Sequence, residues 1–457
     1  MKNEAEVTFL GGTGTVTGSK FLLSYEGTHL LIDCGLFQGL KELRLMNWDP
    51  LPVAVDQIDR VLLTHGHLDH VGYLPRLQEQ GFSGPIYGTG PTLALAKIIL
   101  EDSGKIQEEE AKKANSEGYS KHTPALPFYT LDQAKKTIES FSEVPLEEWQ
   151  KVNASIQYRF VYNGHILGST YIEVKINDKL FVFSGDLGRK NDPLLHDPKK
   201  PRMADYLFVE STYGDRLHPH DDFEEILSGL IQKTIDDRSA LVVPSFAVER
   251  LQMLMYLLWK GNKNHTLPAI PVYVDSPMGN RVLDVFQRFV PWQKLSSSEF
   301  QDMVDYAHVV TSYEETWEII HQEGPRIILA GSGMVTGGRV LSYLQKLIDL
   351  PTTRVLLVGF QAEGTRGRQL KEGAREIKIR GKYIDVQAEI HCIESLSAHA
   401  DQSDLLDWMS DIDPAPTHVY LIHGETLAQE TLAQEISHRY GWPVSIPTLR
   451  EVVKFPV

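Results

Sequence analysis

The chain has 457 residues, which is too long for one ordinary domain of roughly 100–200 residues. Apolar residues make up 42% and charged residues 23%, and this ordinary globular composition excludes a disordered or fibrous protein. The formal net charge of −16 means that the electrostatic field of the whole protein repels polyanions. Any contact with nucleic acid therefore needs a local basic cleft or a bound metal.

Cysteine content and hydropathy limit the location of the protein. Two cysteines, Cys34 and Cys392, exclude a disulfide framework and a Cys-based zinc module. The first residues lack the basic and apolar regions of a secretory signal, and no apolar stretch approaches the roughly 18 residues of a membrane span. We therefore expect a cytoplasmic protein with no membrane contact.

Short strands and turns are expected through the first half of the chain. The Gly-rich stretch 11–14 predicts a tight connection between strands and not a nucleotide loop, because no helical pattern follows it. A polar helix rich in Glu and Lys is expected at about 97–117. A β-rich layer interrupted by helices predicts an αβ/βα sandwich. The expected strands are 7–10, 20–23, 29–33, 60–64, 155–162, 168–176 and 179–185.

After Glu210 the pattern changes to short apolar strands that alternate with helices. This pattern predicts a parallel sheet buried on both faces, which is a doubly wound domain. Strand character returns after about residue 385, with a last strand near 444–455. We therefore expect an α/β domain formed by 1–209 and 387–457, split by an inserted domain at 210–386. The inserted strands are 240–244, 271–275, 326–330 and 354–358, and helices are expected near 248–260, 279–289 and 338–348.

A cluster of metal-ligand side chains follows the strand 60–64. His65, His67, Asp69 and His70 lie within six residues, and alternate positions project to one side of an extended chain. Two imidazoles and a separate carboxylate–imidazole pair suit two adjacent divalent ions. The alternative is a solvated polar loop, but four ligand-type residues at this spacing favour a metal site.

The segment Thr-His-Gly-His-Leu-Asp-His at 64–70 resembles the HxHxDH signature of the metallo-β-lactamase superfamily. Asp33, His165 and Asp186 match the other ligand motifs of that superfamily, in order and with fitting neighbours. Alone, Asp186 would be interpreted as a turn residue and His165 as a surface histidine. Together with 64–70, they imply a metallo-β-lactamase sandwich.

Three further motifs narrow the resemblance to the β-CASP group, the nucleic-acid-processing branch. Glu210 opens Glu-Ser-Thr-Tyr-Gly and looks like motif A, His399 in Ser-Leu-Ser-Ala-His-Ala-Asp looks like motif B, and His423 before Gly-Glu looks like motif C. The resemblance is strongest to bacterial and archaeal relatives of the endonuclease subunit of the cleavage and polyadenylation specificity factor. It implies a β-CASP domain inserted into the sandwich.

The resemblance also implies a cofactor and a substrate. DNA-acting members of the branch carry an aliphatic residue at motif C and RNA-processing members carry histidine, so His423 favours RNA. Two Zn²⁺ per chain are implied. One would be held by His65, His67 and His165 and the other by Asp69, His70 and His423, with Asp186 bridging.

Four residues are candidates for catalysis. Asp69 would orient the attacking water and accept its proton, and Asp33 would hold the ligands by hydrogen bonds. His399 is the candidate general acid, and Glu210 would keep it oriented and protonated. The alternative is that Glu210 and His399 form only a structural hydrogen bond at the domain junction.

Gly-rich turns after the strands of the inserted domain predict contacts with RNA phosphates, because loops at the carboxyl ends of parallel strands bind ligands. The alternative is that their glycines only permit tight turns. Glu249 stands where relatives more often have glycine, which weakens the contact expected from its own loop. The candidates are Ser332, Arg366 and Arg368, followed by Ser245 and Arg250.

We therefore expect a zinc-dependent ribonuclease that acts on single-stranded RNA in RNA processing or decay. The alternatives are a small-molecule hydrolase of esters, thioesters or lactones and a non-catalytic RNA-binding scaffold. The inserted domain argues against the first alternative, and the complete set of ligand positions argues against the second. The sequence does not decide between endonucleolytic and 5′–3′ exonucleolytic cleavage, and it leaves the RNA target and the metal used in the cell open. It also leaves open whether the protein acts alone, as a homodimer or in an RNA-processing complex.

Overall fold

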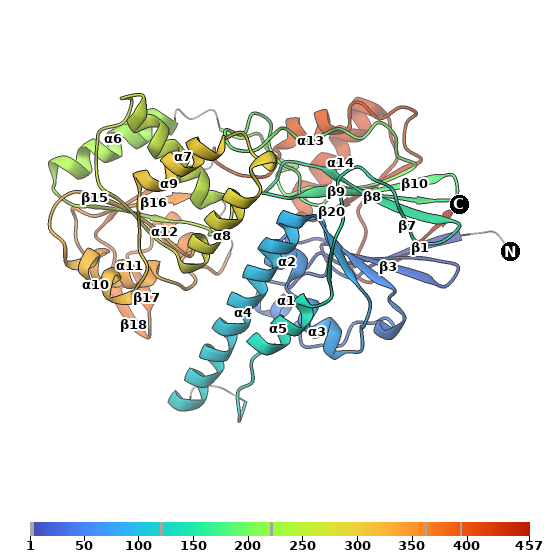
Figure 1. Ribbon diagram of the computed structural model, residues 1–457, viewed down its shortest axis with the longest axis horizontal. Helices are drawn as coiled ribbons and strands as arrows, with labels where there is room; N and C mark the ends of the chain where they lie inside the picture. The colour runs from blue at the N-terminus through green and yellow to red at the C-terminus, as the bar shows by residue number, and fades with distance from the viewer. Residues whose placement is uncertain (1–3, 119–121, 220–222, 360, 362, 394) are drawn as a thin grey trace. The chain divides into compact units, whose positions relative to one another are not determined.

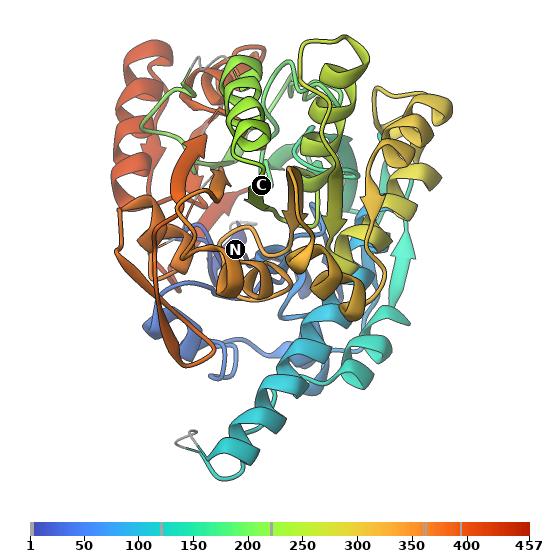
Figure 2. The same ribbon diagram turned by 90° about the vertical axis from the view of Figure 1, so that its left-hand side faces the viewer.

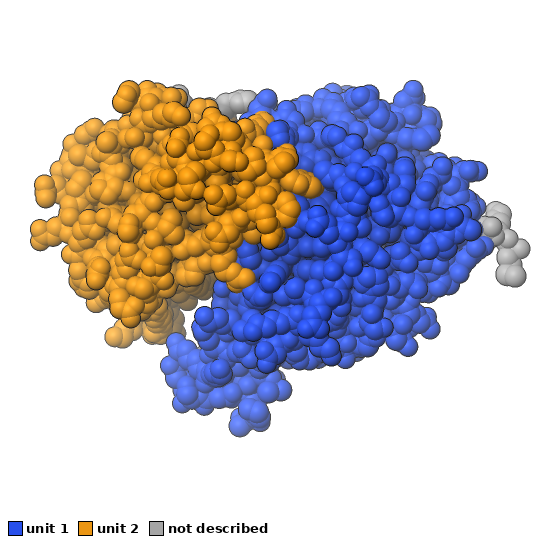
Figure 3. All heavy atoms as spheres, in the orientation of Figure 1, with its two compact units in different colours: residues 1–217, 399–457 blue, residues 218–398 orange. Residues whose placement is uncertain are grey.

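The computed structural model describes residues 4–118, 122–219, 223–359, 361, 363–393 and 395–457 (Figure 1). These residues form two units, coloured separately in Figure 3. Unit 1 comprises residues 1–217 and 399–457, and unit 2 comprises residues 218–398. Glu210 and His399 both belong to unit 1 under this division. No helix among the described residues has the length and apolar character needed to cross a membrane.

The first sheet of unit 1 has seven strands in the order β22-β1-β2-β3-β4-β5-β6. Neighbours from β22 to β3 are antiparallel, and neighbours from β3 to β6 are parallel. The strands are β1 (Glu4–Phe9), β2 (Phe21–Tyr25), β3 (Thr28–Ile32), β4 (Arg60–Leu62), β5 (Ile86–Gly88), β6 (Phe141–Glu143) and β22 (Val452–Pro456).

The second sheet of unit 1 has the order β21-β20-β11-β10-β9-β8-β7, and its strands from β10 to β21 are parallel. The expectation of one last strand near 444–455 is wrong, because β21 belongs to this sheet and β22 to the first. Pro447 lies between them and cannot donate to a strand ladder. The strands are β7 (Gln150–Lys151), β8 (Ile156–Tyr162), β9 (Thr170–Ile176), β10 (Lys179–Phe183), β11 (Tyr206–Glu210), β20 (His418–Ile422) and β21 (Val444–Ser445).

The helices of unit 1 are short except for α4 and α14. α4 begins at Gly90 and not near residue 97, because the Thr89 hydroxyl caps the amide of Thr92 and Pro91 suits the first turn. The polar stretch that the sequence shows is only the last three quarters of this helix, and the first turns before it are apolar and buried. The helices are α1 (Lys41–Met46), α2 (Leu68–Val71), α3 (Leu74–Glu79), α4 (Gly90–Glu117), α5 (Leu131–Ile138), α13 (Gln402–Met409) and α14 (Thr426–Tyr440), with a 3₁₀ turn at Val55–Gln57.

The side chains of β11 alternate between the two faces of the second sheet, and both faces are buried. Phe208 packs between the two sheets, where it stacks on Phe183 with ring centroids 4.3 Å apart. Leu207 and Val209 point the other way, into a cluster with residues of α13 and α14. Glu210 follows at the strand's carboxyl end and is completely buried.

Unit 2 contains a six-stranded, wholly parallel sheet in the order β14-β13-β15-β12-β16-β19, as expected for a doubly wound domain. β12, β15 and β16 are buried along their whole length. The strands are β12 (Ala240–Pro244), β13 (Val272–Asp275), β14 (His308–Val309), β15 (Arg326–Ala330), β16 (Arg354–Val358) and β19 (Glu389–Ile393), and β17 (Glu376–Ile379) and β18 (Lys382–Asp385) form a separate hairpin.

Helices cover both faces of this sheet (Figures 1 and 2). α10, α11 and α12 pack with the hairpin on one face, and α6 and α7 lie on the other. The helices are α6 (Phe223–Asp236), α7 (Arg250–Lys263), α8 (Pro277–Arg288), α9 (Ser297–Tyr306), α10 (Tyr313–His321), α11 (Val340–Leu347) and α12 (Arg366–Lys371), with a 3₁₀ turn at Val290–Trp292.

Backbone hydrogen bonds connect α2 of unit 1 with the loop before β2 and with the loop after β3. The Cys34 amide donates to the His70 carbonyl at 2.7 Å, and the Ser19 amide donates to the Asp69 carbonyl at 2.9 Å. Gly35 lies where these segments meet, and a Cβ atom there would be 1.5 Å from the Asp69 carbonyl oxygen. Only glycine therefore allows this close approach.

We expect Gly35→Ala to destabilise the protein by about 3 kcal/mol, because the added methyl group must push the two segments apart. Thermal unfolding of the purified variant measures the effect. Gly229→Ala is the control, since that helical position has no neighbour within 4 Å and should gain slightly in stability. An unchanged melting temperature for Gly35→Ala would contradict the close approach.

Candidate metal centre

The predicted ligands converge at one end of unit 1, where strands of both sheets finish. Asp33 follows β3, His65 and His67 follow β4, and Asp69 and His70 lie in α2. His165 lies after β8, Asp186 after β10 and His423 after β20. Because β8, β10 and β20 run in the same direction, their carboxyl ends deliver these side chains to one edge of the second sheet.

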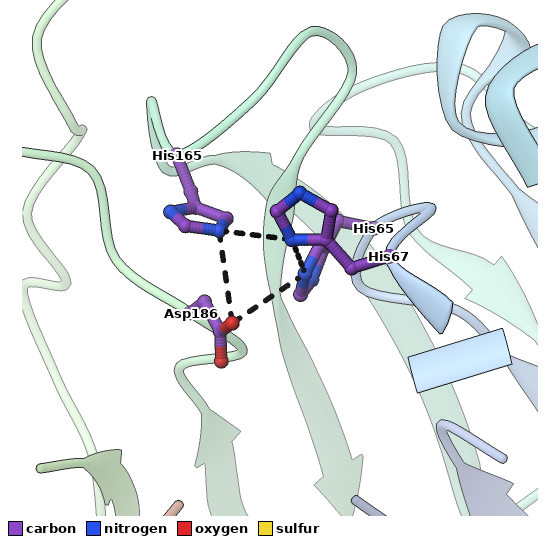
Figure 4. A group of neighbouring side chains, drawn as sticks. All are labelled: His65, His67, His165 and Asp186. Carbon is purple, nitrogen blue, oxygen red and sulfur yellow. Dashed lines mark hydrogen bonds and ion pairs between the residues drawn. The ribbon is translucent and has the colours of Figure 1, made fainter. Parts of the chain in front are cut away.

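The first ligand group is His65, His67, His165 and Asp186, shown in Figure 4. His67 Nδ1 lies 3.1 Å from His65 Nε2 and 3.2 Å from His165 Nε2. Asp186 Oδ2 lies 3.5 Å from His65 Nε2 and 3.6 Å from His165 Nε2. Four ligand atoms thus surround one small volume.

The second ligand group is Asp69, His70, His423 and the same Asp186. Asp186 Oδ1 lies 3.2 Å from His70 Nε2 and 3.5 Å from His423 Nε2. Asp69 Oδ2 lies 3.9 Å from His70 Nε2 and 3.8 Å from His423 Nε2. Asp186 therefore offers one carboxylate oxygen to each group.

These residues fit divalent metal ions. Ligands of a tetrahedral zinc site, at about 2.0–2.1 Å from the ion, lie about 3.3 Å from one another, close to the separations in both groups. Among the described residues, His70 Nε2 and Asp186 Oδ1 are buried without a hydrogen-bond partner although they are 3.2 Å apart. Buried polar atoms that face each other without hydrogen bonding are explained by a cation between them.

Electrostatics keep four of the ligands in the forms that a metal requires. Burial lowers the pKa of His67 to about 4, and burial with neighbouring imidazoles lowers the pKa of His65 and of His165. These rings are therefore neutral, with lone pairs available. Burial opposes ionisation of Asp186, but the surrounding histidines outweigh it and hold the pKa of this carboxyl well below its ordinary value. Burial disfavours the charged form of His70, but the neighbouring carboxylates outweigh it and raise the pKa of His70 well above its ordinary value, so this ring must lose a proton to bind a metal.

Asp33 orients ligands of both groups. Its Oδ2 accepts from His70 Nδ1 at 2.7 Å and from the Thr64 hydroxyl at 2.7 Å. The Thr64 oxygen lies 3.0 Å from His65 Nδ1. With Nδ1 of each ring used in this way, Nε2 of His70 and His65 faces the ligand cluster. Sequence reasoning assigned Asp33 this role but did not identify Thr64.

Ser19 is a second positioning residue that sequence reasoning missed. Its Oγ lies 2.7 Å from His423 Nδ1, which directs His423 Nε2 toward Asp69 and Asp186. The only sequence signal was its place in the Gly-rich segment before β2. Asp33 and His423 both have left-handed backbones, with φ of 56° and 47°, which is unusual outside glycine and typical of functional sites.

A buried lysine supports the same loops. Lys20 Nζ donates to the carbonyl oxygens of Gly18 at 3.0 Å and Gly35 at 2.6 Å, and it lies 4.4 Å from the centre of the Phe37 ring. Burial lowers the pKa of Lys20 to about 8. This cation joins the segment that carries Ser19 to the segment that carries Asp33.

His399 and Glu210, the predicted general acid and its partner, lie beside the first ligand group. His399 Nδ1 is 3.2 Å from Glu210 Oε1, and the His399 ring centre is 4.4 Å from that of His165. Glu210 also accepts from the amides of Leu187 at 2.7 Å and Thr212 at 3.1 Å. Burial lowers the pKa of His399, but the charge and hydrogen bond of Glu210 outweigh it and raise that pKa above its ordinary value.

The expected RNA-phosphate residues belong to unit 2. Ser245 and Ser332 follow the neighbouring strands β12 and β15, and the Ser332 hydroxyl accepts from the amides of Thr336 and Gly337. Arg250 is 6% exposed at the start of α7. Arg366 donates to backbone carbonyls, and Arg368 pairs with Glu372 at 2.6 Å. The RNA contacts of these five residues stay predictions.

Comparison with protein-family models gives three matches along the chain. The metallo-beta-lactamase superfamily matches residues 14–245, the Beta-Casp domain matches 251–370, and the Zn-dependent metallo-hydrolase RNA specificity domain matches 383–447. The chain therefore belongs to the metallo-β-lactamase superfamily and, within it, to the β-CASP ribonuclease group. It is a metal-dependent hydrolase with the expected sandwich and insert.

Relatives cover nearly the whole chain. Ribonuclease TTHA0252 of Thermus thermophilus is 34% identical over 97% of this chain and 98% of its own length. Transcription termination factor FttA of Methanosarcina mazei is 31% identical over 94% of this chain and 68% of its own length. A crystal structure of a protein of unknown function from Enterococcus faecalis, 13% identical, covers 99% of this chain and 100% of its own with a TM-score of 0.55, which shows a shared fold.

We expect Ser19→Ala to weaken metal binding about 10–100-fold, because His423 loses the hydrogen bond that orients its ring. Metal affinity is measured by competition with a chromogenic chelator, and metal content by mass spectrometry. Ser24→Ala is the matched control, since Ser24 Oγ makes the same contact with His29 Nδ1 at 2.8 Å outside the ligand groups. Equal metal affinities for the two variants would remove Ser19 from the site.

Proposed function

We propose that this protein is a zinc-dependent ribonuclease that hydrolyses phosphodiester bonds of single-stranded RNA in RNA processing or decay. The observation that carries the proposal is the arrangement of two ligand groups that share Asp186 and adjoin the Glu210–His399 pair. Two relatives support an RNA substrate, since one is named a ribonuclease and the other a transcription termination factor. Histidine at position 423, as in RNA-processing members of the branch, also favours RNA.

Two Zn²⁺ per chain would occupy the ligand groups. His65, His67 and His165 would hold one ion and Asp69, His70 and His423 the other, with one Asp186 oxygen for each. Two such metal ions lower the pKa of a bound water and offset the negative charge on the phosphate during attack. The donor set of imidazoles and carboxylates suits zinc and also accepts iron or manganese.

Residues of the chain would move the protons of the reaction. Asp69 is the more accessible carboxylate of the centre, with 18% of its side chain exposed against 2% for Asp186, so it can accept a proton from the attacking water. His399 would donate a proton to the departing ribose oxygen. Glu210, with both oxygens engaged, is fixed in position and favours the protonated imidazole.

Unit 2 would hold the RNA chain. Ser245 and Ser332 lie at the carboxyl ends of β12 and β15, where parallel sheets bind ligands. Arg366 and Arg368 begin α12, and Arg250 begins α7. Arg366 would act mainly by shaping the backbone of the Gly-rich loop 331–338, since its guanidinium is bonded to the carbonyls of Val335 and Thr336.

We expect the zinc-loaded protein to cleave a 5′-labelled single-stranded RNA and to leave DNA of the same sequence intact. Products are resolved on a denaturing gel beside an Asp69→Ala control, which should be inactive. Internal fragments would identify an endonuclease, and labelled mononucleotide would identify 5′–3′ trimming. Intact RNA with a fully metal-loaded protein would contradict the proposed function.

We expect His399→Ala to retain metal and to lower kcat about 10²–10⁴-fold, because the leaving group loses its proton donor. In the wild type, kcat should fall as the pH rises through the raised pKa of His399, since the protonated ring is the active form. Glu210→Gln removes the charge that raises this pKa, so the fall in kcat should move to lower pH. Normal turnover in metal-replete His399→Ala would refute the acid role.

A further inference from the structure

The β17–β18 hairpin of unit 2 is a part of the fold that the proposed chemistry does not use. Figures 1 and 2 show it at the margin of unit 2, outside the six-stranded sheet. Its turn, Arg380-Gly381, has φ of 47° and 83°, as in the two-residue turns that join twisted strands. Ile377 and Ile379 face inward and are buried, with exposures of 1% and 0%.

The hairpin and the helix before it are basic in an acidic protein. Residues 366–382 contain seven Lys or Arg and two Glu, a net charge of +5, whereas the chain as a whole carries −16. Arg375, Lys378 and Lys382 are exposed, and their side chains form no ion pair with any described residue. The acidic pair Glu376 and Asp385 faces across the base of the hairpin, so the positive charge is greatest toward its tip.

An exposed aromatic ring lies among these cations. Tyr383 is 65% exposed, which leaves the phenol accessible to solvent. Lys378 stands directly opposite Tyr383 in the strand register, with Nζ 5.4 Å from the ring centre. An accessible ring beside unpaired ammonium groups is the combination by which proteins stack a nucleic-acid base and neutralise its phosphates.

Arg366 connects the hairpin to the Gly-rich loop after β15. Its Nε donates to the Lys378 carbonyl of β17, and its Nη1 donates to the carbonyls of Val335 at 3.2 Å and Thr336 at 3.3 Å. The backbone of β17 and the loop that carries Ser332 are therefore held side by side within unit 2. An RNA chain bound at that loop would therefore have the hairpin as its neighbour within the same unit.

We propose that the exposed tip of the β17–β18 hairpin, formed by Lys378, Lys382 and Tyr383, is a second contact for single-stranded RNA, beyond the Gly-rich loop. Tyr383 and Lys378 share the outer face of the hairpin, where Tyr383 stacks on one base and Lys378 binds the adjoining phosphate. Lys382 lies opposite Ile379 on the other face, next to the turn, and binds a further phosphate from the exposed tip. The inference rests on the proposed ribonuclease function and extends it, because it assigns the enzyme a preference for long RNA over short RNA. The hairpin does not take part in the chemical step.

Equilibrium binding tests the contact without cleavage. Fluorescence anisotropy of the zinc-loaded protein is measured with labelled phosphorothioate RNAs of about 6 and about 24 nucleotides, a span wider than one ordinary single-strand site. In the triple variant Tyr383→Ala/Lys378→Gln/Lys382→Gln, the preference for the long RNA should fall at least about fivefold, and the salt slope should fall by about 1.4 for two lost phosphates.

Two control variants distinguish a specific RNA contact at the hairpin from a general effect of lost positive charge and from the loss of the Tyr383 ring. Lys233→Gln/Lys263→Gln removes two exposed lysines from α6 and α7, on the other face of the sheet, and Lys263 also lies over an aromatic ring, 4.7 Å from the centre of Trp259. This variant should keep the wild-type length preference. Tyr383→Phe retains a stacking ring and should also keep it.

The outcomes are distinct. An unchanged length preference in the triple variant, or an equal loss of affinity for both RNAs, would overturn the second contact. The same change in the α6 and α7 control would also overturn it, since the effect would then be one of general charge. Cleavage of ordinary RNA by the wild type is scored separately, so failure of the ribonuclease proposal shows as intact RNA and not as a lost length preference.

Discussion

The burial of the Asp186 carboxylate is the constraint on which the rest of unit 1 depends. A buried charge is unfavourable unless other groups compensate it, and here the compensation comes from histidines of three separate segments, the stretch 65–70 and the loops that carry His165 and His423. Each histidine must present one particular nitrogen, and three of them have an orienting partner. Asp33 orients His70, Thr64 orients His65 and Ser19 orients His423. The buried Lys20 joins the segments that carry Ser19 and Asp33.

The two-sheet architecture explains how such distant residues meet. Strands of both sheets finish at the same end of unit 1, and the aromatic core between the sheets fixes their spacing. Glu210 illustrates the coupling, because it is the last residue of β11 and lies two residues after Phe208, on the face of the strand that turns toward the other sheet. His399 then meets a carboxylate that two backbone amides already hold in place.

Much of the fold and site could be predicted from local patterns. The HxHxDH segment lies in one stretch of chain, and the alternation of apolar strands and helices after Glu210 predicts a parallel sheet. The positioning residues could not be found in this way. Ser19 acts on a histidine 404 positions away, and one serine in a Gly-rich turn carries no periodic signal. The split of 444–455 into β21 and β22 was only partly hidden, because Pro447 marks a break in the strand, but strand propensity does not say which sheet each piece joins.

The insertion of unit 2 into unit 1 determines when the candidate metal centre can be completed during synthesis. The first 217 residues leave the ribosome without β20, α13 and α14, so the apolar face of β10 and β11 that these elements cover has no partner. Unit 2, residues 218–398, must be made next, which takes about 10–40 s at ordinary translation rates. Only then do His399 and His423 arrive. A nascent chain therefore lacks His399 and His423 until unit 2 has been synthesised, and chain order alone delays completion of the candidate metal centre.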